Sequence, residues 1–157
     1  MKGTKVAISE GGYFYKKVDR TGWFRIFGTQ LFTKDAGTGR FQWSLEVERY
    51  SNRDISGITF GVVEEDVANR LKTKTTFDYS SDIRCRGFYG IGGDYYYLHN
   101  MTKVKNWTVS TGQRYNLVLD LNTGLFKISL NGSVIVKTMS MRGKKVRPSL
   151  AIYYGDN

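Results

Sequence analysis

One stretch near the C-terminal end alternates apolar and polar residues so regularly that it constrains the fold of the whole chain. In Arg114–Leu121 the apolar residues fall on every second position, which is the pattern of a strand with one buried face. Leu125–Leu130 repeats the pattern after Asn122-Thr123-Gly124, a turn whose glycine can adopt a positive φ angle. Asn131-Gly132 then gives the strongest short signal for a tight hairpin, and Ser133–Lys137 returns. These residues predict a three-stranded antiparallel meander.

Similar short segments recur along the rest of the chain. In Phe41–Arg49 the residues Phe41, Trp43, Leu45 and Val47 share one face, and Glu46 and Glu48 share the other. Further strands are expected at Lys5–Ser9, Tyr13–Val18, Trp23–Phe27, Ser56–Val63, Arg86–Ile91 and Tyr95–Leu98. A series of about a dozen short strands separated by turns predicts an all-β sandwich.

Two segments are expected to differ from plain strands. Pro148 is the only proline, and we expect it to be the first residue of the closing strand because proline cannot donate to a β ladder. Residues 64–84 are polar and charged, and they predict a long loop in which Val67 and Leu71, four apart, could form one helical turn. Residues 1–20 are expected to be N-terminal strands or an extension.

The charge of the chain indicates which partners suit it. The formal net charge is +10, and the tightest basic run contains Arg142, Lys144, Lys145 and Arg147. Such a basic patch favours acidic peptides, nucleic acid or anionic lipid. The alternative is a solvated loop that only aids solubility.

Other features exclude several classes of protein. One cysteine allows no internal disulfide, which fits a reducing compartment, and one histidine without a cluster of acidic residues predicts no metal site. No apolar run approaches the roughly 18 residues of a membrane span, and no signal peptide is recognisable. We therefore expect a cytoplasmic or nuclear protein that does not cross a membrane.

The order of the segments resembles the SPRY/B30.2 family. The matching pieces are the tryptophan strand Gly39–Val47, Phe60-Gly61-Val62, Arg86–Gly90, the pair Leu119-Asp120-Leu121 and Phe126–Gly132, and the closing strand Val146–Gly155. The resemblance covers roughly residues 20 to 157. It implies a single SPRY-like domain over residues 1–157, folded as a two-sheet antiparallel β-sandwich of the concanavalin-like jelly-roll type.

The resemblance also implies a function. SPRY domains are non-catalytic modules without a cofactor, and they often recruit targets to ubiquitin ligases or scaffold complexes as adaptors. Their variable loops at one end of the sandwich carry binding, so we expect a monomeric domain that binds a protein or peptide, and the basic charge favours an acidic one. The expected partner-binding residues are Arg53, Asp54, Lys74, Phe77, Tyr79, Tyr95 and Tyr154. Aromatic and arginine side chains are frequent at binding hot spots, although each tyrosine could equally pack in the core.

Two alternative functions stay open at this point. Basic residues interleaved with aromatic ones, such as Lys103, Lys105 and Trp107 together with the basic patch, could bind RNA or another nucleic acid. A lectin-like or glycan-active domain is the other alternative, because Glu46 and Glu48 share one face of a strand. A solvated strand face is the simpler explanation of these two glutamates.

Overall fold

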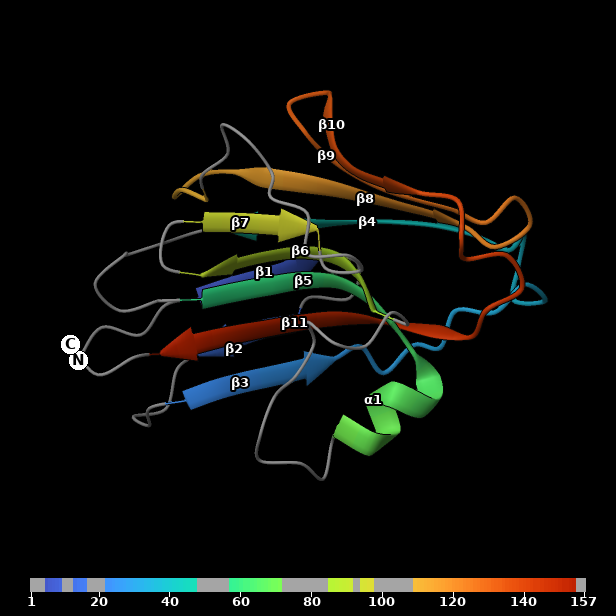
Figure 1. The fold of residues 1–157 in the computed structure, drawn as a ribbon, viewed down its shortest axis with the longest axis horizontal. Helices are drawn as coiled ribbons and strands as arrows, with labels where there is room; N and C mark the ends of the chain where they lie inside the picture. The colour runs from blue at the N-terminus through green and yellow to red at the C-terminus, as the bar shows by residue number, and fades with distance from the viewer. Residues whose placement is uncertain are drawn as a thin grey trace.

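The computed structural model describes residues 5–9, 13–16, 22–47, 57–71, 85–91, 94–97 and 109–154, with side chains for 27–47, 58–69, 87 and 109–152 (Figure 1). The strands are β1 Lys5–Ser9, β2 Tyr13–Lys16, β3 Gly22–Phe27, β4 Arg40–Val47, β5 Gly57–Glu64, β6 Cys85–Ile91, β7 Asp94–Tyr97, β8 Arg114–Asp120, β9 Leu125–Leu130, β10 Ser133–Thr138 and β11 Val146–Tyr154. Helix α1 spans Glu65–Leu71. Each strand that the sequence predicts is present among these residues, with ends shifted by a few residues.

The strands form two antiparallel sheets that face each other (Figure 1). The six-stranded sheet has the order β10-β9-β8-β4-β1-β2, and the five-stranded sheet has the order β3-β11-β5-β6-β7. The all-β sandwich fold expected from the sequence is therefore confirmed. The predicted meander is also confirmed, because β8 pairs with β9 and β9 pairs with β10.

The core lies between the two sheets. Along β8 and β9 every second residue is buried, and Tyr115 of β8 packs on Phe60 of β5 with ring centroids 4.8 Å apart. The predicted faces of β4 are also correct: Trp43 and Leu45 are buried, whereas Glu46 is exposed. Burial of these apolar side chains supplies the main driving force for closing the sandwich.

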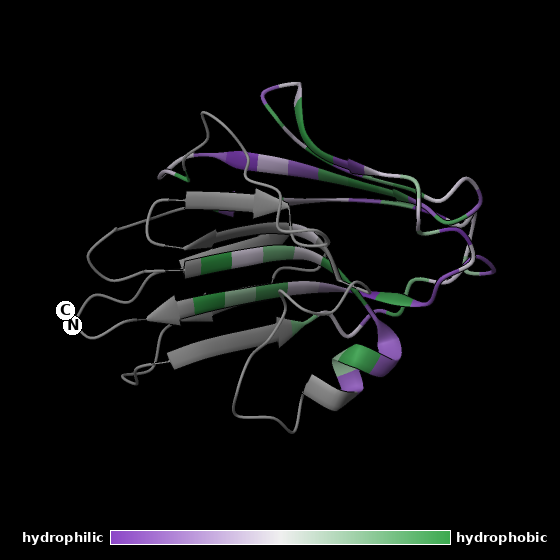
Figure 2. Ribbon diagram, in the orientation of Figure 1, coloured by the Kyte–Doolittle hydropathy of each residue, from purple (hydrophilic) through white to green (hydrophobic). Residues whose placement is uncertain are grey.

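The central strands of the five-stranded sheet are buried on both faces. Phe60 of β5 faces the core, and its neighbour Thr59 on the opposite face is also fully buried. Two residues of α1, Val67 and Ala68, are fully buried as well, although they lie outside the core cluster between the sheets. Figure 2 shows hydrophobic residues along β5 and β11 and a mixed hydrophobic and hydrophilic α1 below them. Double-sided burial explains the nearly continuous apolar run of β5.

The first part of the segment 64–84, which was expected to be a loop, is regular secondary structure, so the prediction is wrong for residues 64–71. Glu64 ends β5, and Glu65–Leu71 forms two helical turns rather than the single possible turn. Glu65 and Asp66 lie in the first turn, where acidic side chains stabilise a helix by interacting with its dipole. Residues 72–84 lie outside the described part of the chain.

Pro148 does not begin the closing strand, so that prediction is wrong by two residues. It is the third residue of β11, and Gly28 N donates to Pro148 O at 2.8 Å, so the missing N–H faces the side of β3. Strand β3 has just ended there at Phe27, which is paired with Ser149. A Cβ on Gly28 would lie 3.0 Å from Pro148 Cδ, so only glycine fits beside the ring without a shift. No residue of β3 lies opposite Pro148, so the proline does not have to donate a hydrogen bond to that strand.

Candidate interaction surfaces

Strand register places two of the candidate tyrosines at one end of the sandwich and the basic patch at the other. At one end Tyr153 lies opposite Gly57, and Gly57 lies opposite Ile91. Tyr154 is one residue beyond this row, and Tyr95 pairs with Gly90 next to it, so the two tyrosines belong to the same end. We call it the tyrosine end. Val146 begins β11 at the other end, about 26 Å away at roughly 3.3 Å per residue.

Most of the predicted loop residues cannot be compared with the structure. Arg53, Asp54, Lys74, Phe77 and Tyr79 lie outside the described residues, and only the backbone is described for Tyr95 and Tyr154. Partner binding by these residues stays a prediction. What the structure adds is that Tyr95 and Tyr154, 59 positions apart in sequence, are brought to one end by β7 and β11.

The basic patch lies at the other end, and half of it is engaged in ion pairs. Lys144 Nζ lies 3.1 Å from Glu64 Oε1, and Arg147 Nη2 lies 2.9 Å from Glu65 Oε1. Arg147 Nη1 also donates to Thr29 O at 2.6 Å. These two cations therefore tie the β10–β11 connection to the β5–α1 junction and to the chain after β3.

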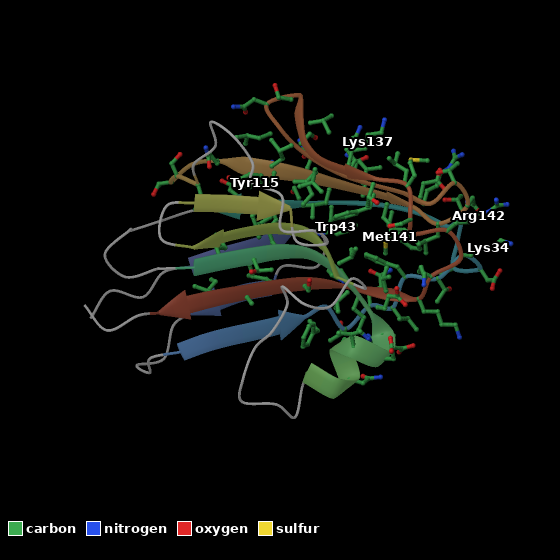
Figure 3. The ribbon with its side chains drawn as sticks, in the orientation of Figure 1. Lys34, Trp43, Tyr115, Lys137, Met141 and Arg142 are labelled. Atoms are coloured by element: carbon green, nitrogen blue, oxygen red, sulfur yellow. The ribbon has the colours of Figure 1, made fainter. Side chains whose placement is uncertain are left out.

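The other two residues of the patch remain open to solvent. Arg142 and Lys145 are exposed, and neither has an acidic partner within the described part of the chain. Figure 3 shows Arg142 and Lys34 at the rim of this end, pointing outward. A nearby arginine, Arg40, is paired with Asp120 at 3.0 Å. Because several local cations are paired with carboxylates, the net positive charge of this patch is smaller than its sequence indicates.

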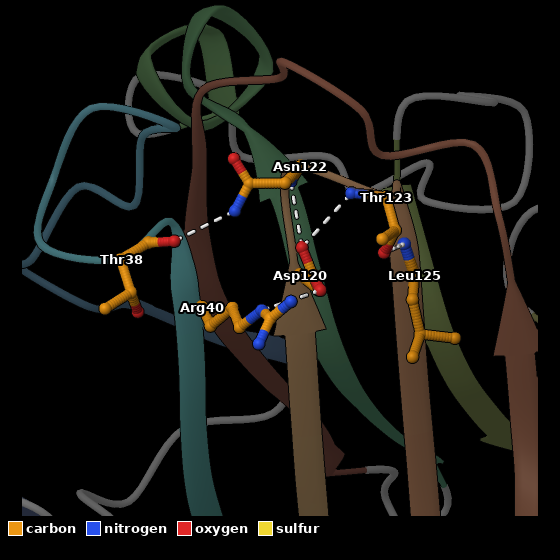
Figure 4. Close-up of polar contacts among 6 residues, drawn as sticks. All are labelled: Thr38, Arg40, Asp120, Asn122, Thr123 and Leu125. Carbon is orange, nitrogen blue, oxygen red and sulfur yellow. Dashed lines mark hydrogen bonds and ion pairs between the residues drawn. The ribbon is translucent and has the colours of Figure 1, made fainter.

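A network around Asp120 fixes the turns at this same end (Figure 4). Asp120 Oδ1 accepts hydrogen bonds from Asn122 N at 2.9 Å and Thr123 N at 3.1 Å, and Oδ2 accepts from Arg40 Nε. Asn122 Nδ2 donates to Thr38 O at 2.9 Å, which joins the β8–β9 turn to the loop before β4. The Thr123 amide, helped by the Asn122 amide and Arg40, lowers the pKa of Asp120 despite its partial burial. Asp120 is therefore a structural residue of the turn.

The described residues give little support to a glycan-active site or a metal site. Glu46 is exposed and lies opposite Arg114 on β8, and Glu48 is outside the described range. Within the described ranges no group of three His, Cys, Asp or Glu residues is placed to hold a metal ion. The helix that is described is too short to cross a membrane.

Sequence reasoning missed a further feature on the edge of the six-stranded sheet. Val134 is 52% exposed and Met139 is 57% exposed, and both belong to β10 or directly follow it. Between them lies Lys137, which is directly opposite Lys127 of β9. The Asn131-Gly132 turn alone would place Val136 opposite Lys127, and the register shift between Val134 and Val136 brings Lys137 there instead, so no signal in the sequence could have revealed this lysine pair.

Comparisons with known proteins bear on the fold. No protein-family model matches the sequence, and a search of curated proteins finds no match. Among solved structures, the SPRY domain of human HERC1 is similar with a TM-score of 0.55 and 15% identity, over 86% of this chain and 77% of that one. A second human SPRY domain is similar with a TM-score of 0.53 and 11% identity, over 92% of this chain and 87% of the other. The likeness extends over most of the chain, and it shows that the chain has a SPRY-like fold.

Proposed function

We propose that this SPRY-like domain is a recognition module that binds a protein segment at its tyrosine end and performs no chemistry. The observation that carries the proposal is the register that brings Tyr95 and Tyr154 together at one end of the sandwich. The segment 51–56, which holds Arg53 and Asp54, leads into β5 at Gly57 and so reaches this end, whereas the segment 72–84 leads into β6 at Cys85, which pairs with Val63 toward the other end. The bound segment would be an extended peptide of acidic or mixed composition.

The binding chemistry follows from the residue types. Tyrosines present large, stiff, amphipathic surfaces that lose little entropy when they are covered. Arg53, in the segment that leads into Gly57, would attract carboxylates and speed the first encounter. A role as an adaptor, including one in substrate recognition by a ubiquitin ligase in the cytoplasm or nucleus, would use the same surface.

Nucleic-acid binding through the basic patch is a weaker candidate. Lys144 and Arg147 would have to break their ion pairs with Glu64 and Glu65 before they could contact phosphates. Only Arg142 and Lys145 are exposed in that patch, and a phosphate backbone needs several cations for useful affinity.

Pull-down from native lysate, with and without nuclease, tests the proposal. The wild type is compared with Tyr154→Ala and with a control, Arg142→Ala combined with Lys145→Ala, at the opposite end. We expect retained proteins that survive nuclease, that are lost with Tyr154→Ala, and that are kept by the control. Thermal unfolding of each variant must stay near that of the wild type, since a large decrease in Tm would show that Tyr154 is a core residue. Loss of all partners with nuclease would contradict the proposal.

A further inference from the structure

Strand β10 is an open edge of the six-stranded sheet. It is the last strand in the order β10-β9-β8-β4-β1-β2, so one row of its backbone N–H and C=O groups has no strand partner among the described elements. Val134 lies opposite Ser129 and Lys137 lies opposite Lys127, both on the face away from the core. Val134 and Met139 are exposed by more than half. The edge therefore offers both backbone groups and apolar side chains.

The two lysines of this edge create a local excess of positive charge. Like charges directly opposite on neighbouring strands destabilise a sheet. Lys127 is half-buried and Lys137 is exposed, and neither has an acidic partner within the described residues. Val118 lies on the other side of Lys127, so no carboxylate stands in this row. In Figure 3 Lys137 lies on the outer side of the sandwich, away from Trp43 and Tyr115 in the core.

Protection of the edge explains only part of this arrangement. A lysine and a β-bulge on an edge strand discourage pairing with other chains, and β10 has a register shift between Val134 and Val136. Protection does not require Val134 and Met139 to be exposed on either side of Lys137. A surface with a central positive charge and two apolar flanks instead matches a partner with the complementary pattern.

We propose that β10 accepts an extended peptide as an added strand, with an acidic residue beside Lys137 and apolar residues beside Val134 and Met139. The register sets the spacing of the partner. Lys137 and Val134 are three residues apart on β10 because of the register shift, but their partners on β9, Lys127 and Ser129, are only two residues apart. A regular strand added to the open edge of β10 would likewise have successive contacts two residues apart. Its sequence pattern would be apolar, any residue, acidic, any residue, apolar.

A peptide fits this surface better than a nucleic acid does. Phosphates would use the lysines but would leave the apolar side chains and the backbone edge unsatisfied. The surface lies on a sheet edge rather than at the tyrosine end, so it goes beyond the function proposed above. The two sites can be tested separately.

Fluorescence anisotropy with a labelled peptide TSVSESVST tests the proposal on the whole chain. Lys137→Glu should weaken binding by roughly tenfold or more. The matched control Lys145→Glu, the same charge change at an exposed site, should leave binding nearly unchanged, as should Tyr154→Ala. Lys137→Glu should also bind TSVSKSVST more tightly than the wild type does. Circular dichroism checks folding, and Lys137→Gln, with an intermediate loss, serves if Lys137→Glu unfolds.

Three results would overturn the proposal. One is an absence of wild-type binding at millimolar peptide. Another is an equal loss with Lys137→Glu and Lys145→Glu, which would reflect net charge alone. The third is complete displacement of the peptide by an oligothymidylate that binds more tightly, which would show phosphate recognition.

Discussion

Replacing Arg147 with methionine separates a structural role of the basic patch from a binding role. The guanidinium donates to Glu65 Oε1 at 2.9 Å and to Thr29 O at 2.6 Å, and the Arg147 side chain is only 16% exposed. Hydrogen bonds to charged groups contribute about 1.5–3 kcal/mol when they are shielded from water. Methionine keeps the length of the aliphatic stem, so the change removes mainly these two polar contacts and a longer one from Arg147 Nη1 to Gly28 O at 3.4 Å.

Two features reduce this loss. The Glu65 side chain is 29% exposed, so water can partly replace its partner. Arg147 Nε is buried without a hydrogen-bond partner, and removing that atom removes its desolvation cost. We expect Arg147→Met to lower the free energy of unfolding by about 2 kcal/mol, which corresponds to about 4–8 °C in Tm for a domain of this size.

Chemical denaturation monitored by tryptophan fluorescence measures the change. The matched control is Lys144→Met, because the Lys144 side chain is 43% exposed and its pair with Glu64 should contribute less than about 1 kcal/mol. A double-mutant cycle with Glu65→Gln should show that part of the Arg147 effect is lost when Glu65 is neutral, while the part due to the contact with Thr29 O remains. Equal, small losses for Arg147→Met and Lys144→Met would refute the reasoning and return Arg147 to the exposed basic surface.

Two further perturbations follow from the described contacts. Asp120→Asn should destabilise the β8–β9 turn near neutral pH. Because the pKa of Asp120 is lowered from 3.8, the carboxylate stabilises the fold above that pH, and this stabilisation is lost as the pH falls below it. In acid titrations the difference in free energy of unfolding between the wild type and Asp120→Asn should therefore shrink. A difference that stays constant with pH would contradict the assignment. Gly28→Ala should cost about 1–3 kcal/mol, because the new Cβ would lie 3.0–3.3 Å from the Pro148 ring. An unchanged urea midpoint for Gly28→Ala would contradict this expectation and show that the chain after β3 shifts freely to make room for the new Cβ.

The sequence predicted the strands well where one face is buried. In β4, β8 and β9 the alternation of apolar and polar residues reflects the single core face directly. It was less informative at α1, because seven residues give too short a pattern for a helix whose Val67 and Ala68 are fully buried. Pro148 was misplaced because the end of β3, which makes room for it, is a property of the neighbouring strand.

The candidate sites could be predicted only in part for a similar reason. The run Arg142–Arg147 is basic in sequence, but its neutralising partners Glu64 and Glu65 come from a strand and helix about 80 positions earlier. The pairing of Lys127 with Lys137 likewise requires the register of the hairpin. Tyr154 was chosen by resemblance and Tyr95 for its residue type, and their placement at one end depends on four paired strands.

The most direct test of the central claim is hydrogen–deuterium exchange on the domain bound to a partner that survives nuclease treatment. Binding at the tyrosine end predicts slower exchange in β7 near Tyr95, in the last residues of β11 and in segment 51–56, with no change over residues 142–147. Protection confined to residues 142–147, with none at the tyrosine end, would contradict the claim.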